Sequence, residues 1–281
     1  MSAPTVSIIG CGWLGLPLAK HLMAQHYVVK GSTTSADKLA TLRRAGIDAH
    51  WLRLNPQPEG DLSALLHAGT LVINVPPKAG QQGDAFHPQQ IEQLVAAIRL
   101  SSVAHVIYVS STSVYPELNR LLVEADVQTE EQSAAPALVR AERWVQTLAP
   151  EREVTILRCG GLMGYDRIPG KYVAGRTVDS GTVPVNYLHR DDAIGIITTL
   201  IEQRPAGIFN AVAPEHPTRE AVYRQSCADF GYALPTLVQP TEPVPYKIIS
   251  PAKLLQITNY AFRYVDPLTF AYGLPTSLAP E

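Results

Sequence analysis

Short apolar runs alternate with amphipathic stretches along the first part of the chain, and this alternation predicts its secondary structure. The apolar and β-branched runs are typical of buried strands, whereas apolar positions three or four residues apart are typical of helices. The expected strands are Val6–Ile9, Tyr27–Gly31, His50–Leu54, Leu71–Val75, Val106–Ser110 and Val154–Arg158. The expected helices are Leu14–Ala24, Ala36–Arg44, Pro88–Leu100 and Ala135–Leu148. Strands and helices that alternate in this way predict an α/β fold with a doubly wound parallel sheet.

The pattern changes after Arg158, where glycine and proline become frequent. We expect a helix over Asp191–Gln203, a strand over Ile208–Val212 and a helix over Arg219–Phe230, followed by a proline-rich end with short elements only. We therefore divide the chain into a Rossmann domain over residues 1–160 and a smaller C-terminal substrate lobe over residues 161–281, which is interleaved with the last sheet strands.

The composition narrows the class of protein. Of 281 residues, 46% are hydrophobic and 17% are charged, which allows a sizeable core and argues against disorder. The net charge is −2 and the 23 basic residues are scattered, so we expect a small neutral or anionic molecule as partner and no nucleic acid. No stretch approaches the ~20 apolar residues of a membrane span, so no membrane partner is expected.

Two features of the sequence indicate the cellular compartment of the protein: its cysteines and the apolar run near its N-terminus. Cys11, Cys159 and Cys227 are widely spaced and odd in number, so they predict neither a disulfide framework nor a metal site, and they suit a cytoplasmic protein. The run Val6–Ala19 could also be a signal-peptide core. However, no basic residue precedes it, and its glycines and proline stand where a nucleotide-binding turn needs them.

The segment Gly10-Cys11-Gly12-Trp13-Leu14-Gly15 matches G-x-G-x-x-G between an expected strand and an expected helix. The first glycine permits the tight turn, the second lets the backbone approach a pyrophosphate, and the third lets helix and strand pack closely. The helix N-terminus offers free N–H groups to the phosphates. We therefore expect Gly10, Gly12, Trp13, Leu14 and Gly15 to bind NADP or NAD. The alternative is a tight turn that binds no ligand.

The end of the second strand favours NADP over NAD. An NAD site usually has an Asp or Glu there for the ribose hydroxyls, but the first acid in this sequence is Asp37. Hydroxyls could instead donate to a 2′-phosphate, with Lys30 or Lys38 supplying charge. Alternatively, these residues only end the strand and cap the next helix. The residues assigned to this part of the cofactor site are Ser32, Thr33, Thr34 and Ser35.

The segment Val106–Tyr115 resembles the V-x-x-S-S-x-x-V-Y stretch of the extended short-chain dehydrogenase/reductases, the epimerase and dehydratase group. Further stretches that resemble this family are Val154–Arg158 with Gly164, Asn186–Asp192 and Ile208–Ala211. The resemblance implies that Ser111 is the Ser/Thr that hydrogen-bonds the substrate oxygen during hydride transfer. We also assign Val75, Pro76 and Ser110, close to the ends of two expected strands, to the cofactor site. The alternative for Ser111 is a serine that only satisfies local backbone groups.

The chain departs from this family at the Tyr-x-x-x-Lys pair, whose tyrosine exchanges the substrate proton. Alignment on Glu142 puts Ala134 at the tyrosine position and Leu138 at the lysine position. A shifted alignment does not restore the pair, because no tyrosine stands between Tyr115 and Tyr165 and no lysine between Lys78 and Lys171. Loss of a positioned acid or base typically costs ~10²–10⁴ in rate, so either another residue substitutes or little redox chemistry remains.

Several polar residues are candidates for the missing proton donor. We assign Tyr165 and Lys171, which flank the loop Gly164–Gly170, as catalytic together with Ser111. The other candidates, each with a structural alternative, are Tyr115, Tyr187 and His189. The Asp191-Asp192 pair is interpreted as a helix cap, with Asp192 holding backbone. Basic side chains that could clamp an anionic substrate or simply be solvated are Arg167, Lys171, Arg176 and Arg190.

Three functions remain open from the sequence. The first is an NAD(P)-binding oxidoreductase of the nucleotide-sugar epimerase/dehydratase type, acting on a small or nucleotide-linked hydroxy or keto substrate. The second is a non-catalytic NADP(H)-binding sensor or regulatory protein that has lost the pair. The third is a non-redox lyase or isomerase on the same scaffold. The family resemblance also implies a homodimer.

Overall fold

The central feature of the fold is a mostly parallel sheet, in a computed structural model that describes residues 3–77 and 82–273. Within these residues the sheet has eight strands in the order β12-β8-β6-β5-β1-β2-β3-β4. All neighbouring strands are parallel except the pair β3 and β4. The strands are β1 (Thr5–Ile9), β2 (Val28–Thr33), β3 (Asp48–Asn55), β4 (Gln57–Gly60), β5 (Thr70–Ile73), β6 (His105–Ser111), β8 (Glu153–Cys159) and β12 (Gly207–Ala211).

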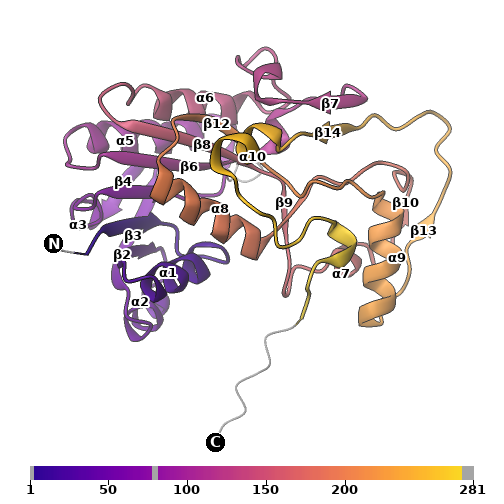
Figure 1. Cartoon of the computed structure of the whole chain (residues 1–281), viewed down its shortest axis with the longest axis horizontal. Coiled ribbons are helices and arrows are strands. Elements are labelled where there is room, and N and C mark those ends of the chain that lie inside the picture. The colour runs from indigo at the N-terminus through magenta and orange to yellow at the C-terminus, as the bar shows by residue number, and fades with distance from the viewer. Residues whose placement is uncertain (1–2, 78–81, 274–281) are drawn as a thin grey trace, which may run out of the picture.

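Helices cover both faces of this sheet, as Figure 1 shows. One face packs against α1 (Gly15–Ala24), α2 (Ala36–Arg44) and α8 (Arg190–Gln203). The other packs against α3 (Leu62–Leu65), α5 (Phe86–Arg99) and α6 (Pro136–Gln146). The predicted doubly wound α/β fold is therefore confirmed.

The core lies in two apolar layers, one on each side of the sheet. Leu18 and Leu22 of α1 are fully buried on one side, and Ile91 and Leu94 of α5 are fully buried on the other. Burying a leucine or isoleucine side chain contributes about 1.5–3 kcal/mol. The spacing of three or four residues within each helix is therefore what fixes the helix against the sheet.

The remaining elements form a smaller lobe on the right of Figure 1 and along the upper edge of the sheet. Its strands are β7 (Arg120–Leu122), β9 (Gly161–Met163), β10 (Thr177–Val178), β11 (Tyr187–His189), β13 (Thr236–Leu237) and β14 (Lys247–Ile249). Its helices are α7 (Pro169–Val173) and α9 (Arg219–Phe230), whereas α10 (Ala252–Thr258) packs on α8 and β12 of the main layers. Short 3₁₀ turns are η1 (Thr112–Val114), η2 (Glu124–Asp126) and η3 (Pro267–Thr269). The strands pair as β7 with β14, β9 with β11 and β10 with β13.

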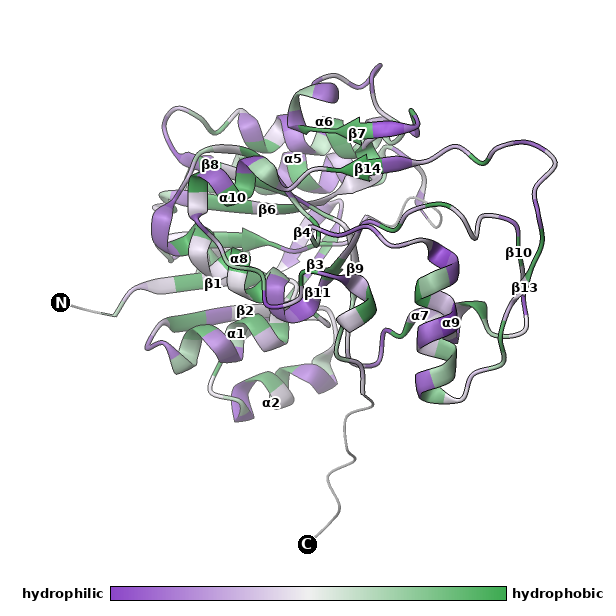
Figure 2. Cartoon of the chain, turned by 45° about the vertical axis from the view of Figure 1, so that its right-hand side comes forward, coloured by the Kyte–Doolittle hydropathy of each residue, from purple (hydrophilic) through white to green (hydrophobic). Residues whose placement is uncertain are grey.

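The two parts of the chain exchange elements. The segment after residue 160 contributes α8 and β12 to the main layers, while β7, from before residue 160, pairs with β14. In the small lobe, α7 packs on α9, and the Gly170 N–H donates to the Ser226 hydroxyl at 2.8 Å. Figure 2 shows hydrophobic and hydrophilic residues alternating along α9, and its buried residues are Val222, Ser226 and Cys227.

The structure differs from the predicted elements in one informative place. The segment Gln57–Gly60, for which no strand was predicted, turns back on β3 as the antiparallel strand β4. Gly60 adopts a φ of +107°, and a Cβ at this position would meet the Trp51 ring at 2.6 Å. No helix in residues 3–77 and 82–273 has the length and apolar character needed to cross a membrane. Within the same residues, no cluster of three or more His, Cys, Asp or Glu side chains suits a metal ion.

Candidate functional site

A cleft of about 710 Å³ lies at the carboxyl ends of the central strands. After β3 and β4 the chain crosses to the other side of β1 and continues with β5, so the strand order reverses between β1 and β5. Ligands of open α/β sheets bind at such a switch point, because the two neighbouring loops diverge there and leave a crevice. The glycine turn after β1, the end of β2 and the end of β6 all line this cleft.

The glycine turn has the geometry that its sequence predicts. Gly10 has a φ of +104°, and a Cβ there would collide with the carbonyl oxygen of Asn74. A Cβ on Gly15 would collide with the carbonyl oxygen of Gly10, so this glycine permits the helix to pack on the turn. Around Gly12, by contrast, nothing lies within 4 Å of a Cβ, because its α-carbon faces the open cleft. Glycine is therefore favoured at each of the three positions for a different physical reason.

Two side chains brace the turn from neighbouring strands. The Asn74 amide donates to the Gly10 carbonyl at 3.0 Å, and the Gly10 N–H donates to the Ser32 hydroxyl at 3.0 Å. The following N–H groups, those of Trp13 and Leu14, have no acceptor in the part of the chain that the structure describes. Both residues line the cleft at the N-terminus of α1. Free N–H groups and the helix dipole suit the diphosphate of a dinucleotide, so the turn fits this group.

The end of β2 places its hydroxyls in two different settings. Ser32 is buried, with 3% of its surface exposed, and its hydroxyl accepts the Gly10 N–H. Thr33 accepts the Ser35 N–H at 3.2 Å. Ser32, Thr33 and Thr34 line the cleft, whereas Ser35 is not among the described residues that line it. These hydroxyls still carry a free hydrogen, so the ones facing the cleft can donate to a ligand.

The basic side chains near β2 differ in whether they line the cleft. The Lys30 ammonium donates to the Ala64 carbonyl at 2.8 Å, which ties it to α3, and Lys30 does not line the cleft. Lys38 of α2 does line it. So does Arg53, near the end of β3, whose guanidinium lies 5.7 Å from the centre of the Trp51 ring. Sequence reasoning missed Arg53, although its place near the end of the strand next to β2 could have indicated it.

The cleft is cationic. Lys38, Arg53 and Arg167 line it, and among the described residues that line it there is no Asp or Glu. The chain as a whole has a net charge of −2, so this local excess of positive charge is a property of the cleft and not of the surface. An anionic ligand is therefore favoured here over a neutral one.

The two serines at the end of β6 face different partners. Ser111 lines the cleft, and its hydroxyl accepts the Ser113 N–H at 3.1 Å, which leaves its hydrogen free to donate. Ser110 also lines the cleft, but it is largely buried and donates to the Glu142 carboxylate at 2.6 Å. Glu142 in turn pairs with Arg158 at 2.7 Å, and each of these two residues is only 1% exposed.

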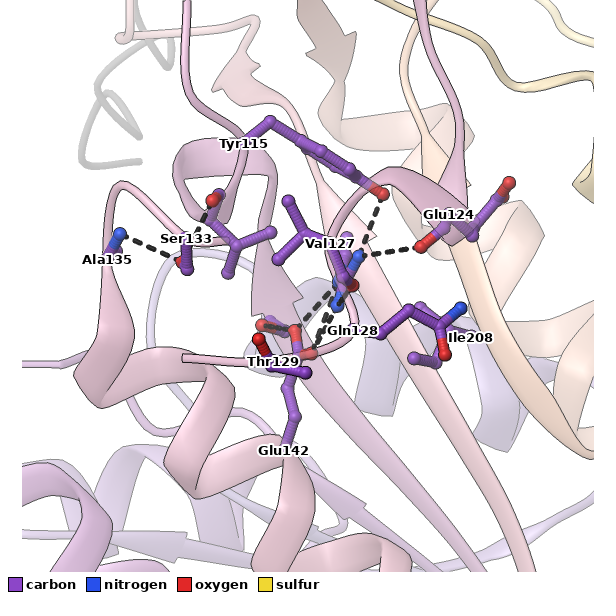
Figure 3. A network of polar contacts seen from close by, with 12 residues as sticks. Tyr115, Glu124, Val127, Gln128, Thr129, Ser133, Ala135, Glu142 and Ile208 are labelled. Atoms are coloured by element: carbon purple, nitrogen blue, oxygen red, sulfur yellow. Dashed lines mark hydrogen bonds and ion pairs between the residues drawn. The ribbon is translucent and has the colours of Figure 1, made fainter. Parts of the chain in front are cut away.

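This ion pair is the centre of a buried polar network, drawn in Figure 3. The Arg158 guanidinium donates to the Tyr115 hydroxyl at 2.9 Å and to the Val127 carbonyl at 3.0 Å. The Tyr115 hydroxyl donates to Asn210 at 2.7 Å. Burial raises the pKa of Tyr115 to about 12, against the lowering effect of Arg158. The Tyr115 hydroxyl is thus engaged in the network and poorly suited to release a proton.

The residues assigned to replace the missing proton donor are not among the described residues that line the cleft. Tyr165 is 37% exposed, has a φ of +53° and donates to the Asp191 carboxylate at 2.9 Å. Lys171 is exposed on α7. Neither is among the described residues that line the cleft, whereas Leu138, in the first turn of α6, is one of them.

The other candidates hold structure together. The His189 ring caps α8, because Nδ1 accepts the Asp191 N–H at 3.2 Å while Nε2 lies 3.0 Å from the Ala271 carbonyl oxygen. Burial lowers the pKa of His189 and raises that of Tyr187 above its usual range. Asp192 accepts two backbone N–H groups, from Arg263 at 2.7 Å and Tyr264 at 3.0 Å. The predicted role of Asp192 in holding backbone is confirmed, but the Asp191-Asp192 pair is not the predicted helix cap, because His189 caps α8.

Comparison with known proteins identifies solved structures that have a similar fold. No protein-family model matches the chain. The UDP-glucuronic acid 4-epimerase of Bacillus cereus, solved in complex with NAD, has a TM-score of 0.75 at 17% identity and covers 95% of this chain and 97% of its own. A short-chain dehydrogenase/reductase superfamily protein of Agrobacterium tumefaciens with bound NAD has a TM-score of 0.72 at 15% identity, covering 94% of each chain.

The protein therefore has the Rossmann fold of the epimerase and dehydratase group within the short-chain dehydrogenase/reductases. A curated relative is much more similar in sequence than these solved structures. Protein YeeZ of Escherichia coli K12 is 35% identical over 267 residues, which are 94% of this chain and 97% of the relative. The chain belongs to the family of Protein YeeZ.

Proposed function

We propose that the protein binds a nicotinamide dinucleotide along the cleft, NADP(H) in preference to NAD(H), and uses it as an oxidoreductase of the epimerase/dehydratase type. The observation that carries this proposal is the cleft itself. It joins a glycine turn with free N–H groups to three cations and contains no carboxylate among its described lining residues. The structural neighbours solved with NAD support a nicotinamide cofactor.

Each part of such a ligand has a counterpart among the lining residues. The glycine turn would hold the diphosphate, Lys38 and Arg53 would face the adenosine end, and Ser111 would face the nicotinamide end. The bound cofactor supplies or accepts a hydride. Ser111 would orient the substrate, because its hydroxyl hydrogen is free to donate to a substrate oxygen while the Ser113 N–H fixes its rotamer. The substrate class is a small or nucleotide-linked hydroxy or keto compound.

The preference for NADP(H) follows from charge. A 2′-phosphate would meet Lys38 and Arg53 without a competing carboxylate, and a hydrogen bond to a charged group is worth about 1.5–3 kcal/mol. We expect calorimetric titration to show NADPH binding at least about tenfold more tightly than NADH. Arg53→Ala should remove most of this difference by weakening NADPH alone. Arg44→Ala, which changes an exposed arginine of α2 outside the cleft, is the matched control. Equal affinities in the unmodified protein would contradict the preference.

A second function, a non-catalytic NADP(H) sensor, is favoured by one observation. Leu138 lines the cleft at the position that the family resemblance gives to the lysine of the Tyr-x-x-x-Lys pair, and a leucine side chain has no titratable group. The two functions differ in turnover. The oxidoreductase oxidises NADPH in the presence of a suitable carbonyl compound, and Ser111→Ala slows it at unchanged NADPH affinity. A sensor binds NADPH equally well and shows no oxidation with any member of a carbonyl library.

A further inference from the structure

A loop of the small lobe reaches across to the glycine turn. The Trp13 indole N–H donates to the Asp166 carboxylate at 2.6 Å, a contact between residues 153 positions apart. The pKa of Asp166 is lowered chiefly by this bond, against the raising effect of burial. The loop is tight, because Gly164 and Arg167 exchange backbone hydrogen bonds at 3.2 and 3.0 Å around the left-handed Tyr165. The side chains on both sides of Tyr165 therefore have fixed directions.

Planar side chains from three segments stack where this loop meets the turn. The Arg167 guanidinium lies 3.9 Å from the centre of the Trp13 ring, and the Arg190 guanidinium lies 4.8 Å from it. Arg190 also lies 3.6 Å from the centre of the Tyr165 ring. Such cation–π contacts hold a guanidinium flat while leaving its edge N–H groups available.

The two arginines of this stack have different surroundings. Arg190 lies next to carboxylates on its own helix and donates to the Trp13 carbonyl at 3.5 Å. Arg167 lines the cleft, and its guanidinium has no hydrogen-bond partner in residues 3–77 and 82–273. An arginine carries five N–H donors, so those of Arg167 are available to an anion in the cleft.

We propose that Arg167 is a diphosphate-binding residue, which the small lobe delivers to the glycine turn and which the Trp13–Asp166 bond holds in place. The proposal rests on the proposed dinucleotide function and adds a residue from outside the Rossmann layers. Trp13 is itself a member of the turn, and its backbone N–H is one of the unused donors. A guanidinium stacked on this indole would face the same phosphate oxygens as the turn, whereas Lys38 and Arg53 line the part of the cleft that we propose for the adenosine end.

The test separates the two phosphate positions of the ligand. Arg167→Ala and the unmodified protein are titrated by calorimetry with NADPH, with ADP-ribose and with 2′-AMP. ADP-ribose contains the diphosphate without a 2′-phosphate, and 2′-AMP contains a 2′-phosphate without the diphosphate. We expect Arg167→Ala to weaken NADPH and ADP-ribose by about tenfold to a hundredfold and to leave 2′-AMP unchanged. Arg167→Lys, which keeps the charge but not the planar fork, should give an intermediate loss.

Two controls make the result specific. Arg176→Ala changes an exposed arginine of the same lobe that does not line the cleft, and it should leave all three affinities unchanged. Trp13 reports on the stack by fluorescence when Trp51 and Trp144 are replaced by phenylalanine, and NADPH should shift its emission less in Arg167→Ala.

Every outcome bears on the proposal. Unchanged NADPH and ADP-ribose affinities in Arg167→Ala overturn it, and they leave the proposed function standing if the unmodified protein binds NADPH. An equal loss for 2′-AMP overturns it as well, because it would mean a general collapse of the cleft. Failure of the unmodified protein to bind NADPH refutes the proposed function, and this inference with it.

Discussion

Glu142→Gln should destabilise the protein strongly, because it removes the charge that balances a buried arginine. Arg158 and Glu142 are each 1% exposed, and three hydrogen bonds of 2.7 to 3.2 Å join the guanidinium to the carboxylate. Breaking a buried ion pair at one partner costs about 3–5 kcal/mol, since the other charge stays buried without its counter-charge. We therefore expect the free energy of unfolding to fall by about 3–5 kcal/mol.

Urea unfolding followed by circular dichroism measures this loss. The midpoint should fall at an unchanged slope, and the melting temperature should drop by roughly 6–15 °C. The double variant Glu142→Leu with Arg158→Met serves as the control, because it removes both charges and should lose less than the sum of the single variants. A loss below about 1 kcal/mol in Glu142→Gln would refute the reasoning, since it would mean that the pair is effectively solvated.

Two further predictions concern stability against pH and the glycine turn. Burial lowers the pKa of His105 from 6.5 to about 4, so the native state resists the proton that the unfolded chain accepts. Stability should be full above about pH 6.5 and fall as the pH drops toward 4, and in urea titrations His105→Gln should flatten this fall; an unchanged slope would contradict it. Gly10→Ala should abolish NADPH binding in calorimetry, because its φ is +104° and a methyl group would strike Asn74. Tight binding by this variant would mean that the turn can rearrange.

The layers of the fold could be predicted from the sequence because they depend on local patterns. The leucines of α1 recur at helical spacing and the strands are continuous apolar runs, so each element specifies its own buried face. The glycine turn belongs to the same category, since its motif and its flanking strand and helix are contiguous. The hairpin β4 could not be predicted in this way. Pro58 within it and Pro56 just before it argue against a strand, and its pairing with β3 depends on Gly60 turning the backbone beside Trp51.

The candidate site was only partly predictable, because several of its contacts join distant segments. Lys30 and Lys38 were equivalent in sequence as counter-charges, but a bond to Ala64 takes Lys30 out of the cleft. Arg53 enters the cleft from a strand whose role depends on its pairing with β2. The contact of Trp13 with Asp166 depends on how the small lobe folds back over the turn, and no local pattern encodes that.

Ser110 and Ser111 are adjacent at the end of β6, yet their hydroxyls have different partners. Both serines line the cleft. Because successive residues of a strand point to opposite faces, one step along β6 separates a hydroxyl that donates into the buried network from one whose hydrogen stays free. Ser110 points toward α6 and Glu142, and Ser111 ends the strand at the cleft. Because Ser110 donates to a carboxylate that Arg158 also holds, the end of β6 is anchored where Ser111 must stay positioned. The buried ion pair therefore supports from behind the Ser111 hydroxyl that we propose to face the substrate, and its loss should disturb the site as well as the stability.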